Sequence, residues 1–389
     1  MLVVKIIYKK VMLKDEKKIN VILCGGGTGG HIFPMIAIAD ELKRRNKQNN
    51  ILFVGSKDRM EMEIVPKYNY QIIGLWISGI KRSSMILNIL LLGMPFIFKN
   101  IFLPFKILFS IIQSIFILLK YRPDMVIGFG GYSSGPFLFI SSMLKYKTAI
   151  QEQNSYPGLT NKILSNRVDM IFIAYDNIKK YISNKSIFNY GNPLRKMNFN
   201  SDQKNSYDYF KLDKNKKTIL VLGGSLGAKS INDGILNNLS LIRESSFQIL
   251  WQTGKYYYEE INSNDPGINN LIIKPFIKRM DIAYEVADII ISRAGAIAIS
   301  ELCIIGKPSI LIPSPNVVDD HQTKNASEIQ EKGGCVMIKD TDCKDLMMNE
   351  AISLISNNKK MNLMKDSLKK LGKPFASKNI VDKIYKSIS

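Results

Sequence analysis

Residues 20–34 read Asn20-Val-Ile-Leu-Cys-Gly-Gly-Gly-Thr-Gly-Gly-His-Ile-Phe-Pro34, and this stretch decides the fold class. The apolar residues 19–24 predict a short buried strand, because a β-branched run ends abruptly at glycines. After Pro34, apolar residues at helical spacing lead into three basic residues, which predicts a helix. The glycine loop between them would present backbone N–H groups to a polar or anionic ligand. Its glycine spacing fits neither the P-loop nor the dinucleotide-binding motif.

The same succession of strand, glycine-rich loop and helix recurs in both halves of the chain. In the first half, a second loop runs Gly128-Phe-Gly-Gly-Tyr-Ser-Ser-Gly-Pro136, and in the second half such loops occupy residues 223–229 and 293–301. Alternating strands and helices predict an α/β protein with two doubly wound parallel sheets. Ligands of such sheets bind at the carboxyl ends of the strands, here in a cleft where the two domains face each other.

The length of 389 residues favours two domains. Residues 191–195, Gly-Asn-Pro-Leu-Arg, interrupt all periodicity and are followed by a polar stretch. We expect an N-terminal extension at 1–18, a first domain at 19–190, a second at 191–372, and a C-terminal helix at 373–389 that packs back on the first domain. The extension lacks the apolar run of a signal peptide, and translation could begin at Met1 or at Met12.

The net charge of +21 has two explanations that the sequence leaves open. One is a polyanionic partner, either nucleic acid or an anionic membrane surface. The other is a general bias of the composition, because lysines are spread along the whole chain. The four cysteines form no CxxC pair and indicate reduced cytosolic thiols rather than a disulfide framework or a zinc site.

Residues 85–119 are almost wholly apolar, with Pro95, Lys99, Pro104 and Lys106 between the apolar residues. Each uninterrupted run is shorter than the about 20 residues that cross a bilayer. One interpretation is one or two buried helices, and the other is a lysine-studded apolar face that enters a membrane surface.

Several polar residues in the loops are candidate site residues. Glu301 follows a glycine loop one turn into a predicted helix, where a carboxylate can hold ribose hydroxyls while N–H groups hold a diphosphate; alternatively it complements the helix dipole. Arg195 either reaches the diphosphate or is a surface charge. The two histidines, His31 and His321, both lie in these loops, and His31 is the better candidate for a catalytic base. No ligand spacing indicates a metal.

Seven motifs follow one another between residue 19 and the C-terminus, and together they identify a family. They are Gly26-Gly-Thr-Gly-Gly-His31, Gly128-Phe-Gly-Gly-Tyr-Ser-Ser-Gly-Pro136, Glu152-Gln-Asn154, Gly191-Asn-Pro-Leu-Arg195, Gly223-Gly-Ser225, Ser292-Arg-Ala-Gly-Ala296 with Ser300-Glu301, and Asp320-His-Gln322. The chain resembles the MurG family of peptidoglycan glycosyltransferases, which convert lipid I to lipid II.

The resemblance implies a GT-B fold, a lipid acceptor in the first domain and UDP-N-acetylglucosamine (UDP-GlcNAc) in the second. It implies an inverting transfer of GlcNAc to the C4 hydroxyl of the acceptor, without a metal or cofactor. We expect a peripheral enzyme on the cytoplasmic face of the plasma membrane, at an anionic surface, without nucleic acid and with other cell-wall synthesis proteins as possible partners. The rivals are a GT-B transferase for another lipid, such as diacylglycerol, and a non-catalytic nucleotide-binding membrane protein.

The resemblance also assigns roles to individual residues. Thr28, Gly29 and Gly30 would face the donor sugar and diphosphate. The candidacy of His31 as the base rests on histidine chemistry instead, and the alternative is that His31 holds the closed state of its loop. In the second domain, helix-start residues would wrap the phosphate and Glu301 would hold the ribose. The chain departs from the family pattern at Ala298, where threonine is usual, and at Gln151, where histidine is common. The remaining expected substrate contacts are Asn154 and Gln322 to the GlcNAc, Arg195 and Ser225 to the diphosphate, Ile277 to the uracil, and Ala296, Ile297, Ala298, Ile299 and Ser300 to the phosphate.

Overall fold

The computed structural model describes residues 16–79, 101–184, 186–195, 203–264 and 267–388, and the chain divides into two compact units. The first comprises Met1–Gln153, Pro157–Arg195 and Phe375–Ser389, and the second Asn154–Tyr156 and Lys196–Pro374. The division falls after residue 195 rather than after residue 190, and residues 154–156, expected in the first domain, belong to the second unit.

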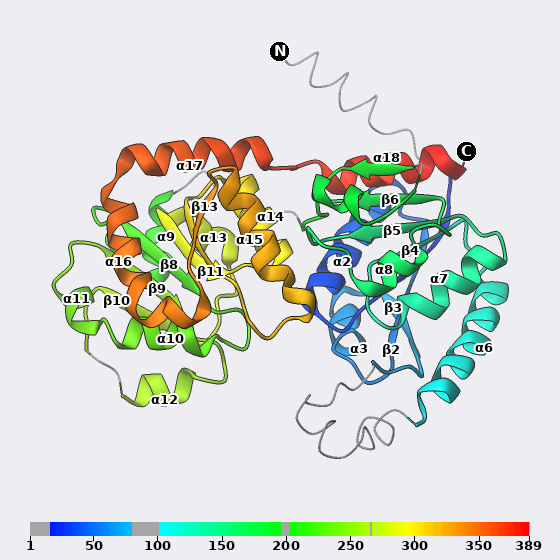
Figure 1. Cartoon of the computed structure of the whole chain (residues 1–389), viewed down its shortest axis with the longest axis horizontal. Coiled ribbons are helices and arrows are strands. Elements are labelled where there is room, and N and C mark those ends of the chain that lie inside the picture. Colours follow the sequence, from blue (N-terminus) through cyan, green and yellow to red (C-terminus); the bar gives the residue numbers. More distant parts are fainter. Residues whose placement is uncertain (1–15, 80–100, 185, 196–202, 265–266, 389) are drawn as a thin grey trace, which may run out of the picture. The chain divides into compact units, whose positions relative to one another are not determined.

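The first unit is built on a parallel sheet that is seven-stranded within the described residues (Figure 1). The strand order is β3-β2-β1-β4-β5-β6-β7. Successive strands of the chain are added on one side of β1 up to β3 and then on its other side from β4 onward, so the neighbours β1 and β4 mark the point where the order reverses. Both strands end in glycine loops, so these loops meet at the topological switch point, where open α/β sheets bind ligands. The strands are β1 (Asn20–Cys24), β2 (Asn50–Ser56), β3 (Gln71–Leu75), β4 (Met125–Gly128), β5 (Thr148–Glu152), β6 (Met170–Ile173) and β7 (Ile187–Asn189).

Helices cover both faces of this sheet. α2 and α18 pack together and share one apolar core with the sheet, whereas α6, α7 and α8 contribute to the core on the other face. The helices of this unit are α2 (Gly29–Arg45), α3 (Glu61–Ile64), η1 (Val65–Tyr68), α6 (Leu103–Tyr121), α7 (Ser134–Met143), α8 (Leu159–Leu164), η2 (Asp176–Lys180) and α18 (Ala376–Ile388).

The C-terminal helix α18 is bound to the first unit by both apolar and polar contacts. Ile380, Val381 and Ile384 are fully buried in the core shared with α2. At the end of α2, the guanidinium of Arg45 contacts Asp382, and the buried Asn49 donates a hydrogen bond of 2.8 Å to the Tyr385 hydroxyl. The chain therefore returns to the first unit after completing the second.

The second unit repeats the topology with a parallel sheet in the order β10-β9-β8-β11-β12-β13. Its switch point lies between β8 and β11, and both strands run into glycine loops. The strands are β8 (Thr218–Leu222), β9 (Gln248–Gln252), β10 (Leu271–Lys274), β11 (Ile289–Arg293), β12 (Ser309–Ile312) and β13 (Cys335–Met337). The four inner strands, β8, β9, β11 and β12, are almost completely buried, which explains their continuous apolar runs, since inner parallel strands are covered on both faces.

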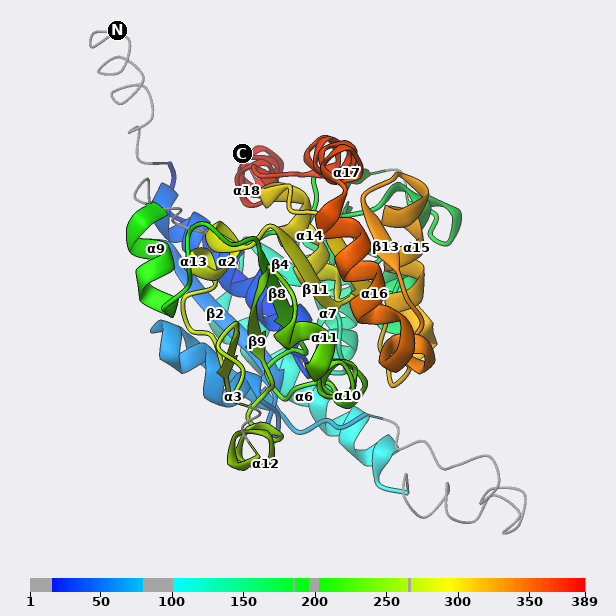
Figure 2. The same ribbon diagram turned by 90° about the vertical axis from the view of Figure 1, so that its left-hand side faces the viewer.

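Helices of the second unit pack in contacting pairs, among them α10 with α16 and α14 with α17 (Figure 2). The helices are α9 (Gln203–Phe210), α10 (Lys229–Leu236), α11 (Leu239–Arg243), α12 (Tyr258–Ser263), α13 (Met280–Val286), α14 (Ala296–Ile305), η3 (Val318–Asp320), α15 (His321–Glu331), η4 (Asp340–Asp342), α16 (Cys343–Ser356) and α17 (Asn358–Leu371).

Helix α6 turns an apolar face outward. Ser110, Ser114 and Leu118 are its buried residues, and both serine hydroxyls donate to carbonyls of their own helix. Phe105 and Phe116 remain 65% and 69% exposed. Pro104 lies in the first turn, where proline fits without breaking the helix. The exposed large apolar residues of the helix are Phe105, Ile107, Leu108, Phe109, Ile112, Phe116 and Leu119.

The described part of the apolar segment is therefore not a buried helix pair, and its residues 85–100 lie outside the described residues. By length and composition alone, α6 is the one helix in the described ranges that could cross a membrane. It is longer than the sequence indicated, because Pro104 starts the helix rather than interrupting it.

All four cysteines are buried and free, which agrees with reduced thiols. Burial raises the pKa of Cys303 and of Cys335 to about 12, so these thiols stay protonated and unreactive at neutral pH.

Candidate active site

The first glycine loop leads directly into α2, which begins at Gly29 rather than after Pro34 as the sequence suggested. Thr28 is the extended N-cap residue, and its carbonyl accepts from the N–H groups of His31 and Ile32. Pro34 lies inside the helix. His31 therefore lies in the first turn of a helix, beside the switch point of the sheet.

The imidazole of His31 is held by the glycine loop. Its Nδ1 lies 2.8 Å from the carbonyl oxygen of Gly26 and 3.3 Å from the Thr28 hydroxyl. A carbonyl oxygen only accepts hydrogen bonds, so Nδ1 carries the proton and Nε2 is the basic nitrogen. Nε2 faces the second glycine loop, since a Cβ on Gly130 would come within 3.0 Å of it.

A buried carboxylate that the sequence reasoning missed lies under the first glycine loop. Glu61 is fully buried, and its Oε2 accepts from the Gly27 N–H at 2.8 Å while Oε1 accepts from the Ser56 N–H at 2.9 Å. A Cβ on Gly26 would lie 2.1 Å from the Glu61 side chain, and one on Gly55 2.5 Å from it. Glycine at both positions therefore makes room for this carboxylate. In the sequence, a glycine inside a strand such as Gly55 indicates only a close approach and does not point to a carboxylate.

The two glycine loops of the first unit touch through their backbones. A Cβ on Gly131 would lie 2.6 Å from the carbonyl oxygen of Gly26, and Gly131 has a φ of +86°, which also favours glycine. In contrast, a Cβ on Gly27 would meet no atom within 4 Å. The loop is thus closely packed on its inner side and borders open space at Gly27.

Arg195 lies on the first unit. Its Nη1 donates to the Tyr68 hydroxyl at 2.5 Å, and its guanidinium stacks over the Phe33 ring with 4.5 Å from Cζ to the centroid. Phe33 belongs to the first turns of α2, next to Gly29. The guanidinium is therefore on the side of the first glycine loop, and its contact with a diphosphate stays a prediction.

In the second unit, the side chain of Gln252 connects the loop that carries Ser225 with Ile277. Its Nε2 donates to the Gly224 carbonyl at 2.9 Å, and its Oε1 accepts from the Ile277 N–H at 2.8 Å. Ile277 is buried and its N–H is engaged, so a contact with uracil would use its carbonyl group. Ser225 is exposed at the tip of the same loop.

Helix α14 begins with Gly295 as its N-cap residue, and Ala296, Ile297 and Ala298 form its first turn. The Ser300 hydroxyl donates to the Ala296 carbonyl at 2.9 Å. Gly295 has an ordinary negative φ, and a Cβ there would meet no atom within 4 Å. Neither the backbone conformation nor a neighbouring atom of the described chain therefore requires glycine at this position. The missing side chain leaves room for a ligand at the helix N-terminus, where anions bind.

Glu301 belongs to α14 but lies beyond its first turn, and that first turn contains no acidic residue. The helix dipole acts mainly within the first turn, so it does not account for this carboxylate. The Tyr284 hydroxyl donates to Glu301 Oε2 at 2.8 Å. Burial and then the Glu301 charge raise the pKa of Tyr284 well above its usual value, so the phenol stays a donor. A carboxylate has acceptor capacity for further donors, such as ribose hydroxyls.

Arg293, which the sequence placed in a motif without a role, joins the loops around α14. Its Nη2 contacts the Ser230 hydroxyl at 3.0 Å, near the start of α10, and its Nη1 contacts Asp340 and the carbonyls of Ile312 and Pro313. One partly buried guanidinium thus links the ends of β11 and β12 to the helix that follows the loop at 223–227. We assign it a structural role in holding these loops together.

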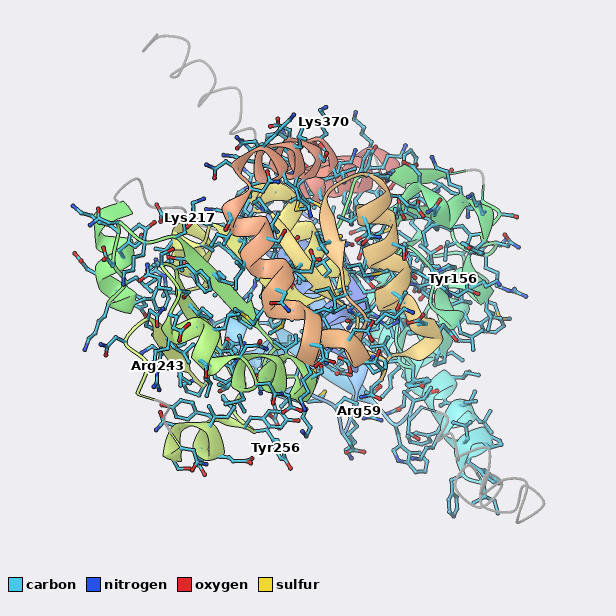
Figure 3. All side chains as sticks on the ribbon, turned by 60° about the vertical axis from the view of Figure 1, so that its left-hand side comes forward. Arg59, Tyr156, Lys217, Arg243, Tyr256 and Lys370 are labelled. Carbon is cyan, nitrogen blue, oxygen red and sulfur yellow. The ribbon has the colours of Figure 1, made fainter. Side chains whose placement is uncertain are left out.

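Asn154 and Gln322 come together at α15. Asn325 donates from Nδ2 to Asn154 Oδ1 at 3.2 Å and accepts from the Ser155 N–H at 2.8 Å. The Gln322 Oε1 accepts from the Ser314 N–H at 2.9 Å, one helical turn before Asn325. The ammonium of Lys324 lies over the ring of Tyr156, which is labelled in Figure 3, in a cation–π contact. Residues 154–156 are therefore held by the second unit through α15.

Among the described residues, no group of three or more His, Cys, Asp or Glu side chains is gathered as a metal site.

Gly295→Ala should weaken UDP binding by about fivefold, because the new methyl group occupies the space at the helix N-terminus. The melting temperature should change little, since the position has an ordinary φ and open surroundings. Titration calorimetry with UDP and thermal unfolding measure the two quantities. Gly267→Ala, also in open space but at a φ of +59° in another loop, serves as the control for UDP affinity. If Gly295→Ala binds UDP as tightly as the parent protein does, the N-terminus of α14 is not part of the nucleotide site.

Comparison with known proteins identifies the family. Residues 21–173 match the glycosyltransferase family 28 N-terminal domain, and residues 218–382 match the glycosyltransferase family 28 C-terminal domain. A protein of Christiangramia forsetii is 46% identical over 376 residues, covering 96% of this chain and 99% of the relative. A protein of Flavobacterium psychrophilum is 46% identical over 369 residues, covering 94% and 97%. Both are named UDP-N-acetylglucosamine–N-acetylmuramyl-(pentapeptide) pyrophosphoryl-undecaprenol N-acetylglucosamine transferase.

Among solved structures, the crystal structure of Acinetobacter baumannii MurG is similar, with a TM-score of 0.74 at 27% identity, covering 95% of this chain and all of that chain (100%). The expected fold class, two parallel-sheet α/β domains of the GT-B type, is therefore confirmed. The chain is a glycosyltransferase that belongs to family 28, and within it to the MurG family that its sequence motifs indicated.

Proposed function

We infer that this chain transfers GlcNAc from UDP-GlcNAc to the C4 hydroxyl of the N-acetylmuramyl residue of lipid I, forming lipid II for peptidoglycan synthesis. The observation that carries this inference is near full-length similarity to relatives that are named for this transfer. Four of the seven motifs, those that follow β1, β4, β8 and β11, lie at the two switch points, where ligands of such sheets bind.

The donor nucleotide is held by the second unit in this proposal. The N–H groups of Ala296, Ile297 and Ala298 bind the phosphates, and Glu301, oriented by Tyr284, accepts from the ribose hydroxyls. Backbone N–H groups serve where Ala298 lacks the usual threonine hydroxyl. Ile299 and Ser300 complete the turn around the phosphate. The exposed Ser225 and the guanidinium of Arg195 add donors to the diphosphate.

The sugar and the acceptor are held by the remaining residues. Asn154 and Gln322, both at α15, bind the GlcNAc hydroxyls, and the carbonyl of Ile277 meets the uracil. Thr28, Gly29 and Gly30 line the region of the donor sugar and diphosphate. The reaction is an inverting displacement: the C4 oxygen attacks the anomeric carbon, the bond to UDP breaks, and Nε2 of His31 takes the hydroxyl proton.

The leaving diphosphate gains negative charge as the glycosidic bond breaks. Helix N-terminal N–H groups and Arg195 offset this charge. The contact between Nδ1 and the Gly26 carbonyl supports His31 as the base, because an Nδ1–H that donates to this oxygen leaves Nε2 as the basic nitrogen.

The acceptor is a membrane lipid, and we propose that α6 brings the enzyme to the cytoplasmic face of the plasma membrane as a peripheral protein. Its outward apolar residues would enter the acyl boundary of the bilayer. Trp76, Phe105 and Phe109 border an apolar hollow of about 450 Å³ on this face. Lys106 lies over the Trp76 ring and donates to the Ser78 hydroxyl, where its charge can meet anionic head groups. Other cell-wall synthesis proteins could meet the enzyme there.

Phe105→Ser combined with Phe116→Ser should weaken binding to vesicles of anionic lipid by about tenfold, since two exposed aromatic rings no longer enter the bilayer. Added salt should weaken binding of the parent protein as well. Vesicle co-sedimentation measures both effects, and activity on a short-chain soluble acceptor should stay nearly intact.

Leu346→Ser combined with Leu363→Ser is the matched control, because these side chains are exposed apolar residues of the second unit. If both double variants lose vesicle binding equally, or if the α6 variant binds vesicles as well as the parent does, the membrane-docking surface lies elsewhere.

The transfer itself is tested by UDP release from UDP-GlcNAc in the presence of a lipid I analogue, of diacylglycerol, or of no acceptor. Release should depend on the lipid I analogue. Release with diacylglycerol would favour another lipid-directed transferase, and binding without any release would indicate a non-catalytic protein.

A further inference from the structure

We propose that Glu61 is a positioning residue for His31, acting through the peptide bond between Gly26 and Gly27. This inference rests on the proposed role of His31 as the base. Glu61 itself lies beneath the loop, has no exposed surface and would touch neither substrate.

The geometry is a chain of two hydrogen bonds across one peptide unit. The Gly27 N–H donates to Glu61 Oε2 at 2.8 Å, and the Gly26 carbonyl accepts from His31 Nδ1 at 2.8 Å. The N–H and the carbonyl belong to the same planar peptide group, which cannot rotate internally. The carboxylate therefore fixes the direction of the carbonyl that orients the imidazole.

The same arrangement also affects the electronic state of the histidine. Hydrogen bonds in a chain polarise one another, so a carboxylate on the N–H makes the carbonyl oxygen a stronger acceptor. A stronger acceptor at Nδ1 favours the tautomer in which Nε2 is unprotonated. In many proteins a carboxylate fixes the tautomer of a histidine by accepting a hydrogen bond directly from the imidazole. Here the peptide group between Gly26 and Gly27 lies between the carboxylate of Glu61 and the imidazole of His31.

The surroundings indicate that this position is built for a carboxylate. A buried carboxylate is costly unless its oxygens are hydrogen-bonded, and here both oxygens accept from backbone N–H groups. Gly26 and Gly55 leave the space that the side chain fills. A role limited to loop packing is the alternative, and the experiments separate the two.

The chain has only two histidines, His31 and His321, so imidazole nitrogen spectra are simple to assign. In the parent protein, long-range ¹H–¹⁵N spectra at neutral pH should show His31 with a protonated Nδ1 and an unprotonated Nε2. This measurement needs no variant, and a dominant Nε2–H tautomer would overturn the proposal.

Glu61→Gln should shift the His31 nitrogens toward a mixture of tautomers and lower kcat by about tenfold, with KM for UDP-GlcNAc changed by less than about twofold. Gln keeps the shape of the side chain but cannot accept from both N–H groups. Gly55→Ala is a second variant that retains the carboxylate and displaces it, since the new Cβ would overlap Glu61 Cγ. It should shift the His31 signals in the same direction.

Asp169→Asn is the matched control. Asp169 also accepts from a backbone N–H, that of Thr148, but at the amino end of β5. It should leave both His31 signals and kcat unchanged. If Glu61→Gln lowers stability while the His31 signals and kcat stay as in the parent, Glu61 only packs the loop. If His31→Ala leaves turnover intact, the base assignment fails, whereas the spectra still report on the connection between Glu61 and His31.

Discussion

Replacing His31 by alanine should lower turnover by about 100-fold or more, while UDP-GlcNAc affinity stays within about twofold. The C4 hydroxyl of the acceptor is a weak nucleophile, so losing the group that takes its proton raises the barrier of the chemical step. In the proposed site, α14 and the loop at 223–227 hold the uridine and phosphates, so donor binding should persist. Steady-state kinetics together with calorimetry on the donor measure the two effects.

His321→Ala is the natural control, because it removes the other histidine of the chain. His321 opens α15 and is assigned no part in proton transfer, so its removal should not lower kcat comparably. Parallel losses of donor affinity and rate in His31→Ala would make His31 a binding residue instead of the base.

Glu301→Ala should weaken UDP binding by more than about 1.5 kcal/mol, which corresponds to more than tenfold in the dissociation constant. A carboxylate that accepts from two ribose hydroxyls makes charge-assisted hydrogen bonds, and its loss removes both. Tyr284 would lose its acceptor in the same variant, so folding must be checked by circular dichroism and thermal unfolding.

Glu259→Ala controls for the charge of a carboxylate near a helix start, because Glu259 lies in the first turn of α12 in the same unit. Its UDP affinity should equal that of the parent. Unchanged affinity in a folded Glu301 variant would end the ribose assignment.

The doubly wound parallel class of both sheets could be predicted because each strand that carries a glycine loop is a short, continuous apolar run. The strands β7 and β13 were missed, since three residues at the edge of a sheet leave too short a pattern. The start of α2 was placed too late because proline usually marks a helix boundary, whereas the two glycines before His31 adopt the helical conformation here.

The candidate site was predictable only where residues belong to recognisable motifs. His31 and Glu301 stood out through their place after glycine loops. Glu61 is 34 residues away in sequence from Gly27, its hydrogen-bond partner, and Asn325 is 171 residues away from its partner Asn154. Such partners depend on the packing of distant segments, and nothing in the local spacing of a glutamate or an asparagine predicts them.

The apolar segment illustrates the same limit. Its composition left burial and membrane contact equally open. Only the three-dimensional contacts of α6, with serines inward and phenylalanines outward, favour a surface that meets lipid.

The most direct test of the proposed reaction is product analysis after incubation with UDP-GlcNAc and a lipid I analogue. The expected product is a disaccharide lipid with GlcNAc β-linked to the C4 oxygen of the muramyl residue, with one UDP released per disaccharide. His31→Ala should form this product about 100-fold more slowly or slower still. An α-linked product, GlcNAc on a different lipid, or UDP-GlcNAc left unchanged with a competent acceptor would contradict the proposed reaction.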